Sequence, residues 1–486
     1  MQRRKKHSKG TAIIIATLTL TVTIPLAGLG FDVATLYLVK SKLSTAVDAA
    51  ALAGARALSQ GADGAAQAAN AVSTVTLFFN ANYPSGYWHT SGVTESAVVD
   101  DTSTPNYRTV TVTASVQAPL YFLRVLNQQF ATVAAVGQAA RRDALVILVL
   151  DRSSSMNGVV PGTGLKACDI MKTDAAAFVG YFAPGRDQIG FVSFGSSAFL
   201  YQSTTSFTTA DAGGNTVQSL IGQITCGGNT ASAEALAKAY GEVLRVNNSR
   251  RMNVIVFMTD GRPNGVTADF INNRIDPTTC AKGAASLNGV LAQWAGGAVA
   301  NGTTAGLMNY TQTQVTVPNE GAVGAGAGCK FAGDLTLAYK DLNGMPAADI
   351  FGNALAGSYS QSVSAPPYNG QTVNLTGVNS PLQIVMASAN ALDNEATQIR
   401  TDVTLKPSIY TIALDGDGGA ADQPDTLLLR KIANDSSLAG DAGVGHVFYQ
   451  QQISQPHGYF AEAPDATQLA VAFQTIATQI SLRLSQ

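Results

Sequence analysis

Residues 144–156 read ALVILVLDRSSSM, an unbroken apolar run that ends in Asp151-x-Ser153-x-Ser155. Such a run predicts a strand buried on both faces, as in a parallel sheet. Ligands gather beyond the carboxyl ends of such strands. A carboxylate with two alternate hydroxyls offers hard oxygen ligands, the set that suits Mg²⁺ or Mn²⁺. The motif alone has low specificity, so its interpretation depends on the segments that accompany it.

Two later segments complete the pattern. Residues 226–234 read CGGNTASAE, a glycine turn that leads into a helix, and residues 253–261 read NVIVFMTDG, a second buried strand that ends on a carboxylate. This order of strand with DxSxS, glycine turn with threonine, and strand with TDG resembles the von Willebrand factor A (vWA) domain. The resemblance implies a doubly wound α/β domain with a metal-ion-dependent adhesion site.

The resemblance also implies a set of metal ligands. By matching positions they are Asp151, Ser153, Ser155, Thr230 and Asp260. In the family the hydroxyls bind the metal directly, the aspartates act largely through water, and an open position accepts an Asp or Glu of a protein partner. The implied cofactor is therefore Mg²⁺ (or Mn²⁺). The alternative is that the two serines cap a helix and that the aspartates end their strands by chance.

Composition and the N-terminal residues indicate the cellular location of the protein. Charged residues make up only 13% of the 486 residues, and the net charge of -2 lacks the basic excess of a nucleic-acid-binding protein.

Residues 1–9 are strongly basic, whereas residues 11–30 contain no charge and are long enough to span a bilayer. The basic flank predicts a single-pass anchor with a cytoplasmic N-terminus and the rest of the chain exported. Pro25 is expected to kink this span. A cleaved signal peptide is the alternative.

The segment after the span carries a second resemblance. Residues 28–32 read GLGFD, and residues 48–56 read DAAALAGAR. Together they resemble the N-terminal region of TadE/TadG-type proteins of tight-adherence (Flp) pilus assembly. The resemblance implies that the anchor lies in the bacterial inner membrane, with the bulk of the chain periplasmic or extracellular. The small residues Ala46, Ala49, Ala50, Ala53 and Gly54 would let another element approach this helix closely. That element is either a partner subunit or the chain's own β module, and a generic Ala-rich helix remains the alternative.

From residue 87 to 142 the pattern changes to strands. Residues 109–116 read TVTVTASV, with the period of two that a half-exposed strand has. Strands are also expected at 96–100 and 131–139, with a short helical stretch at 120–126. We expect a small antiparallel sheet that packs on the Ala-rich helices. The expected domains are a basic tail at 1–10, the transmembrane helix at 11–31, a TadE/TadG-like helical and β module at 32–142, and a vWA domain at 143–486.

Strands alternating with helices after residue 143 predict βαβ units and a mostly parallel sheet. The expected helices are residues 164–182, 216–224, 231–244, 380–401, 426–434 and 466–484, and the further strands are 187–194, near Phe199, 408–414 and 446–449. Residues 262–379, rich in Gly, Asn, Ala and Thr, are an insertion far beyond the usual connection length. The insertion leaves the sheet beside the proposed metal, so it is either part of the ligand-recognition surface or a passive addition.

The four cysteines suggest disulfides in an exported protein, because their number is even and no CxxC motif is present. Three pairings are possible. We predict Cys168 with Cys226, because both are expected near the metal edge, and Cys280 with Cys329, because both lie in the insertion.

Three functions compete. The first is an anchored, metal-dependent protein of tight-adherence pilus assembly or surface attachment that binds an acidic partner among pilus-assembly or envelope proteins. The second is a vWA adaptor for a MoxR-like AAA+ ATPase, which requires a cytoplasmic vWA domain. The third, a metal-dependent hydrolase, lacks a general base beside the motifs. The nearest candidate is Glu234, which we expect to face along its helix. We therefore predict a binding protein and not an enzyme.

Overall fold

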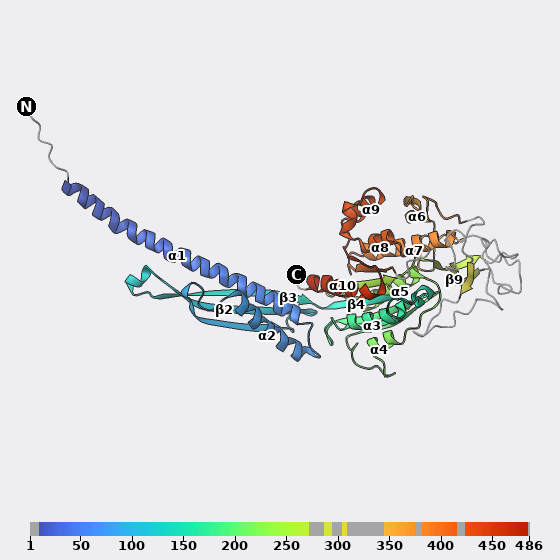
Figure 1. Cartoon of the computed structure of the whole chain (residues 1–486), viewed down its shortest axis with the longest axis horizontal. Coiled ribbons are helices and arrows are strands. Elements are labelled where there is room, and N and C mark those ends of the chain that lie inside the picture. The colour runs from blue at the N-terminus through green and yellow to red at the C-terminus, as the bar shows by residue number, and fades with distance from the viewer. Residues whose placement is uncertain are drawn as a thin grey trace, which may run out of the picture. The chain divides into compact units, whose positions relative to one another are not determined.

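The computed structural model of the chain describes residues 9–160, 162–271, 286–293, 304–308, 345–375, 382–415 and 423–484. Two compact units are present: one is Met1–Arg142 with Ser485–Gln486, and the other is Asp143–Leu484. The N-terminal unit begins with α1 (Lys9–Ala57), which contains both the expected span and the Ala-rich segment and continues through Pro25 (Figure 1). Among the described residues, α1 is the one helix long and apolar enough to cross a membrane.

The rest of the N-terminal unit is a helix and an antiparallel sheet, as expected. Helix α2 (Gly64–Asn82) is capped by Asp63, whose side chain accepts a hydrogen bond from Ala66 N. The described strands β1 (Ser91–Asp100), β2 (Tyr107–Pro119) and β3 (Phe130–Arg142) pair antiparallel in that order. Between β2 and β3 lies the short helix η2 (Leu123–Leu126).

The small residues of α1 serve packing within this unit. Ala46 and Ala50 are buried in one core with apolar side chains of α2 and β2, and Ala53 is also buried. At Gly137 of β3 the approach is especially close, since a Cβ atom would lie 2.6 Å from the carbonyl carbon of Val47. Of the two candidate partners for this face of α1, the structure shows contact with the β module of the same chain.

The C-terminal unit is built on a mixed sheet that is mostly parallel. Within the described residues its strand order is β12-β11-β7-β4-β5-β6, and only β6 runs antiparallel to its neighbour. The strands are β4 (Ala144–Asp151), β5 (Gln188–Phe194), β6 (Ala198–Thr204), β7 (Met252–Thr259), β11 (Ser408–Leu414) and β12 (Phe460–Ala463). The central strands β4 and β7 are almost wholly apolar because helices cover both faces.

Alternate residues of each strand point to opposite faces, which gives two apolar cores. On one face, Leu145, Ile147 and Val149 of β4 share a core with helices α5 (Ser232–Val246), α7 (Leu382–Thr401) and α8 (Thr426–Ala433). On the other face, Val146 and Leu148 share a core with α3 (Ala167–Val179), α4 (Val217–Gly222) and α10 (Leu469–Leu484). The doubly wound sheet predicted from the sequence is confirmed.

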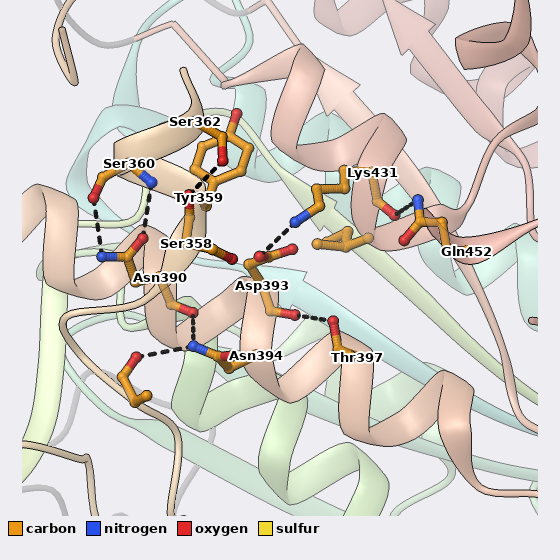
Figure 2. A network of polar contacts seen from close by, with 12 residues as sticks. Ser358, Tyr359, Ser360, Ser362, Asn390, Asp393, Asn394, Thr397, Lys431 and Gln452 are labelled. Atoms are coloured by element: carbon orange, nitrogen blue, oxygen red, sulfur yellow. Dashed lines mark hydrogen bonds and ion pairs between the residues drawn. The ribbon is translucent and has the colours of Figure 1, made fainter. Parts of the chain in front are cut away.

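A buried polar network joins the helices on the first face (Figure 2). Lys431 Nζ of α8 forms a 2.6 Å ion pair with Asp393 Oδ2 of α7 and lies 4.3 Å from the centre of the Phe448 ring. Asn390 of α7 accepts a hydrogen bond from the backbone N–H of Ser360, in α6 (Ser358–Ser362). Because these groups bind one another, they fix the relative positions of the helices while their polar atoms stay buried.

One expectation is corrected here. The predicted strand at 446–449 is instead part of helix α9 (Val444–Gln452), and the edge strand of the sheet is β12. Where it is described, the insertion contains regular structure. It contributes β8 (Gly265–Ile271), β9 (Ser286–Gln293) and β10 (Thr304–Met308), an antiparallel sheet in the order β10-β9-β8. Every second residue of β8 from Val266 to Phe270 is apolar, a pattern that needs a buried face. These side chains, Val266, Ala268 and Phe270, pack in the first core.

Candidate functional site

The candidate site lies where β4 and β7 end. These strands are parallel neighbours, with Leu150 opposite Met258, so Asp151 and Asp260 emerge at the same sheet edge. Ser153 follows Asp151 in a short loop, and Ser155 lies in the short helix η3 (Ser154–Asn157). Asp151, Ser153 and Asp260 are buried, and Ser155 is partly exposed. The site therefore opens to solvent on the side of Ser155.

Three oxygen atoms form the centre of the site. The Oγ atoms of Ser153 and Ser155 are 2.8 Å apart. Both hydroxyls donate to Oδ1 of Asp260, over 2.8 Å from Ser155 and 3.3 Å from Ser153. The serines thus point toward the carboxylate of the neighbouring strand and form no side-chain cap on η3. The cluster brings together residues that are more than a hundred positions apart in the sequence.

Asp151 lies beneath this cluster and is fully buried. Its Oδ1 accepts a 2.7 Å hydrogen bond from the backbone N–H of Ser153, and its Oδ2 accepts a 2.5 Å bond from the Thr259 hydroxyl. Burial raises the pKa of Asp151, while the hydrogen bonds from Thr259 and Ser153 favour the ionised form. Thr259 was not among the predicted residues, although its place beside Asp260 in the TDG motif was a signal for it.

Thr230 is held at the same edge by a different neighbour. Its backbone N–H donates a 2.7 Å bond to Oδ1 of Asn264, and Asn264 N donates to the Thr230 carbonyl over 3.1 Å. Thr230 is buried. The contacts that fix it are with Asn264 and not with the three-oxygen cluster. Asn264, four residues beyond Asp260, is a second residue that the sequence reasoning missed.

A disulfide holds the rim of the site. Cys168 of α3 is bonded to Cys226 in the glycine turn, with a Cα–Cα distance of 6.2 Å. The Cys226 carbonyl accepts a 3.0 Å bond from Asn157 Nδ2, so the turn is joined to the serine loop as well as to α3. The predicted Cys168–Cys226 pair is confirmed. The predicted Cys280–Cys329 pair lies outside the described residues.

Arg152, between Asp151 and Ser153, is fully buried rather than exposed to solvent. Its Nη1 donates a 3.3 Å bond to the Gly227 carbonyl, and its own carbonyl accepts a 2.6 Å bond from Gly227 N. Gly195, after β5, leaves the room for this arrangement, since a Cβ atom there would lie 2.6 Å from the Gly227 carbonyl oxygen. Arg152 therefore ties the serine loop to the glycine turn.

The donor set fits a small divalent cation. Adjacent ligands of an octahedral Mg²⁺ bound at about 2.0–2.1 Å lie about 2.9 Å apart. The three oxygens of Ser153, Ser155 and Asp260 form a triangle with sides of 2.8, 2.8 and 3.3 Å, close to one face of such an octahedron. No three His, Cys, Asp or Glu side chains of the described residues are grouped for a metal. An ion at this edge would therefore depend on the serine hydroxyls.

Glu234 is occupied elsewhere. It is buried on α5, where Oε1 accepts from Ala198 N over 3.0 Å and forms a 2.8 Å ion pair with Lys238. Its Oε2 accepts a 2.8 Å bond from the Thr267 hydroxyl of β8. Burial raises the pKa of Glu234. With both oxygens engaged, this side chain fastens β6 and β8 to α5 and does not reach toward the site as a general base.

The chain matches two sequence families. Residues 146–262 match the von Willebrand factor type A domain, in agreement with the doubly wound fold of the C-terminal unit. Residues 10–57 match the family described as putative Flp pilus-assembly TadE/G-like. With both regions in one chain, the protein matches a TadG-type pilus-assembly protein, as the sequence patterns predicted. No curated protein matches the chain significantly in sequence.

Several solved structures are similar to this chain at low identity and low TM-score. A point mutant of the PilB minor pilin from Streptococcus sanguinis is 15% identical with a TM-score of 0.36, and the match covers 81% of this chain and 79% of that one. The vWF domain of the type V pili tip protein Mfa5 from Porphyromonas gingivalis is 16% identical with a TM-score of 0.33, covering 71% and 97%. The pilus adhesin SpaC from Lactobacillus rhamnosus GG is 12% identical with a TM-score of 0.35, covering 81% and 35%.

Proposed function

We propose that this protein is a membrane-anchored binding component of Tad (Flp) pilus assembly or surface attachment, which captures an acidic protein partner through a divalent metal. The metal, Mg²⁺ or Mn²⁺, would be held by Asp151, Ser153, Ser155, Thr230 and Asp260. A bound ion would supply positive charge and an open coordination position that a partner's Asp or Glu carboxylate can fill.

The observation that carries the proposal is the three-oxygen face of Ser153, Ser155 and Asp260 at the open edge of the sheet. Its two hydroxyls contribute no charge, so within this face only the Asp260 carboxylate would offset the charge of a divalent ion. Asp151 receives hydrogen bonds from Ser153 N and Thr259 and so orients the serine loop without occupying the exposed side. A positive ion with an exposed side is the arrangement that attracts a foreign carboxylate.

Helix α1 supplies the proposed anchor. Its described side chains from Ile13 to Phe31 are uncharged, mostly apolar and largely exposed. The hydroxyls of Thr17, Thr19 and Thr21 donate to carbonyls one turn back in the helix, so a bilayer could cover them without leaving them unpaired. The basic residues before the span favour a cytoplasmic N-terminus.

The disulfide agrees with this orientation. With a cytoplasmic N-terminus, the binding site would lie in the periplasm or outside the cell. The Cys168–Cys226 bond at its rim is of a kind that persists in such oxidising compartments and is rare in the cytosol.

The test is recovery of partners from membranes with the full-length protein. Wild type, Asp151→Ala and Ser154→Ala are compared with and without EDTA. Ser154 is exposed and lies between the two proposed serine ligands without belonging to the oxygen cluster, so its variant is the matched control. We expect partners that are lost in EDTA and in Asp151→Ala but kept in Ser154→Ala. Equal recovery in all samples would refute metal-bridged capture.

A topology reporter fused after Gln486 addresses the adaptor alternative. The proposal requires the C-terminal unit to be exported. Activity of a cytoplasm-specific reporter at that position would instead support docking to a cytoplasmic AAA+ ATPase.

A further inference from the structure

The motif GLGFD at residues 28–32 forms a socket for the turn between β2 and β3. Asp32 of α1 is buried, and its carboxylate accepts backbone hydrogen bonds from three consecutive residues of that turn. Oδ1 accepts from Tyr121 N over 2.8 Å, and Oδ2 accepts from Leu123 N over 2.8 Å. Phe122 N contributes to both oxygens, at 3.2 and 3.1 Å. The first charged residue after the apolar span is thus bound by N–H groups of the turn.

Two apolar contacts complete the socket. The Phe122 ring lies against Gly28, where a Cβ atom would be only 2.0 Å from the ring, so only glycine permits this approach. The rings of Phe31 and Tyr121 meet edge to face with centroids 5.5 Å apart. Figure 1 shows this end of the β2–β3 hairpin beside α1. The position of the turn along α1 is therefore fixed by three independent contacts.

The turn itself presents apolar side chains to solvent. We call residues 121–130 the hairpin tip. Its exposed apolar side chains are Tyr121 (45% exposed), Val125 (82%), Leu126 (69%) and Phe130 (50%). Arg124 is exposed between them. Contiguous exposed apolar groups on a secreted or anchored domain mark a surface that something else covers.

The position of the hairpin tip along α1 indicates which kind of surface covers its exposed apolar side chains. A helix rises 1.5 Å per residue, so about twenty residues cross the hydrocarbon core. The uncharged stretch of α1 ends at Phe31, directly before the Asp32 that binds the tip. If residues 11–31 span the bilayer, the socket lies at its outer surface. Tyr side chains and an Arg with a long aliphatic stem are favoured at that interface.

We infer that the hairpin tip is a second membrane contact, which inserts Tyr121, Val125, Leu126 and Phe130 into the interface of the outer leaflet. The inference rests on the proposed anchor. Helix α1 alone leaves the protein free to rotate and tilt about one span, whereas a tip fixed to the helix and embedded beside it restricts the angle at which the N-terminal unit leaves the membrane. The bilayer is favoured as the occupant because the apolar surface of the tip continues that of the span.

The experiment places single tryptophans in the full-length protein, reconstituted in phosphatidylcholine–phosphatidylglycerol vesicles with brominated acyl chains. Val125→Trp reports on the tip. Val98→Trp on β1 is the matched control, a valine that is 60% exposed in the same unit and away from the tip. Leu20→Trp reports on the span. The chain's own two tryptophans are accounted for by subtracting the wild-type emission.

We expect Val125→Trp to be blue-shifted and quenched by shallow bromines, Leu20→Trp to be quenched by deep bromines, and Val98→Trp to be unaffected. Quenching of Leu20→Trp without quenching of Val125→Trp overturns the tip contact and leaves the anchor intact. Loss of quenching at both positions refutes the anchor itself. Equal quenching of Val125→Trp and Val98→Trp also overturns the inference, because the whole unit would then lie on the membrane.

Asp32→Asn provides a second, independent variant. It keeps the size of the side chain but removes the charge that the three N–H groups of the tip bind. Combined with Val125→Trp, it should reduce the quenching of the tip while leaving that of Leu20→Trp unchanged. Unchanged tip quenching would contradict the role of Asp32 as the positioning residue.

Discussion

Ser155 Oγ donates a 2.8 Å hydrogen bond to Oδ1 of Asp260, a residue 105 positions away. The bond joins the loops that follow two adjacent parallel strands, and Ser153 Oγ completes the cluster at 2.8 Å from Ser155. Within the site, Ser155 is the partly exposed member of this cluster, so it marks the side from which a metal and a partner would approach.

The first prediction concerns metal binding by these hydroxyls. Mn²⁺ should raise the thermal unfolding temperature of the wild type, because an ion that binds only the folded state stabilises it by about 2.7 kcal/mol at a hundred times its dissociation constant. Ser153→Ala and Ser155→Ala should each weaken this shift strongly, while Ser154→Ala should retain it. Differential scanning fluorimetry with and without Mn²⁺ checks this. An equal shift in all four proteins would exclude the serines as ligands.

The second prediction concerns the disulfide. Closing a loop with a sequence separation of 58 residues restricts the unfolded chain, which stabilises the fold by up to about 4 kcal/mol. Cys168→Ser/Cys226→Ser should therefore lower the free energy of unfolding by an amount of that order. It should also weaken Mn²⁺ binding, because Cys226 lies in the turn that leads to Thr230. Denaturant titration and Mn²⁺ titration measure the two effects, and an unchanged Mn²⁺ affinity would show that the turn holds its shape without the bond.

The third prediction concerns the packing of β3 on α1. Gly137→Ala places a methyl group 2.6 Å from the Val47 backbone, which cannot move without displacing the helix. We expect destabilisation of the N-terminal unit by about 1–3 kcal/mol, the usual cost of overpacking. Gly64→Ala, at a position where a Cβ atom would meet nothing within 4 Å, is the control and should be neutral or slightly stabilising. Amide hydrogen exchange in α1 and β3 reads out the difference.

The fourth prediction concerns pH and Glu395 of α7. Burial raises the pKa of Glu395 from 4.5 to about 7, with a smaller contribution from Asp349, although Asn353 Nδ2 donates a 2.8 Å bond to its carboxylate. Because the folded pKa is above the unfolded one, the folded state binds more protons. Stability from this group is therefore complete below about pH 4.5 and is lost as the pH rises through about 7.

The loss amounts to at most about 3 kcal/mol for a shift of this size. Glu395→Gln is neutral at every pH, so its free energy of unfolding should fall less than that of the wild type between about pH 5 and pH 8. Urea titrations at the two pH values measure both proteins. Parallel pH dependences would contradict a raised pKa at this position.

Much of the fold was predictable because it follows from local periodicity. The apolar runs at 144–151 and 252–259 are strands that helices bury on both faces, and such runs are evident in the sequence. The failure at 446–449 has a physical cause. His-Val-Phe-Tyr has the β-branched and aromatic residues of a strand, but Phe448 is buried against the helices of the first core, so tertiary packing overrides the local preference.

The candidate site was predictable only in part. Asp151, Ser153, Ser155 and Asp260 follow from motif and topology, because parallel strands bring their carboxyl ends to one edge. The supports were not predicted: Thr259, Asn264 and Arg152 act through contacts with distant segments. The part played by Glu234 likewise became evident only from its bonds to Ala198 and Thr267.

The sequence by itself determined the alternation of strands and helices, the apolar span, the two family resemblances and the identity of the proposed ligands, because each depends on residue types at short and regular spacing. Only the tertiary structure decided that Ser153, Ser155 and Asp260 share one face, that Asp32 binds the hairpin tip, and that part of the insertion forms a sheet. Those relationships depend on contacts between segments that are far apart in the sequence, and the packing of the whole chain determines which segments come into contact.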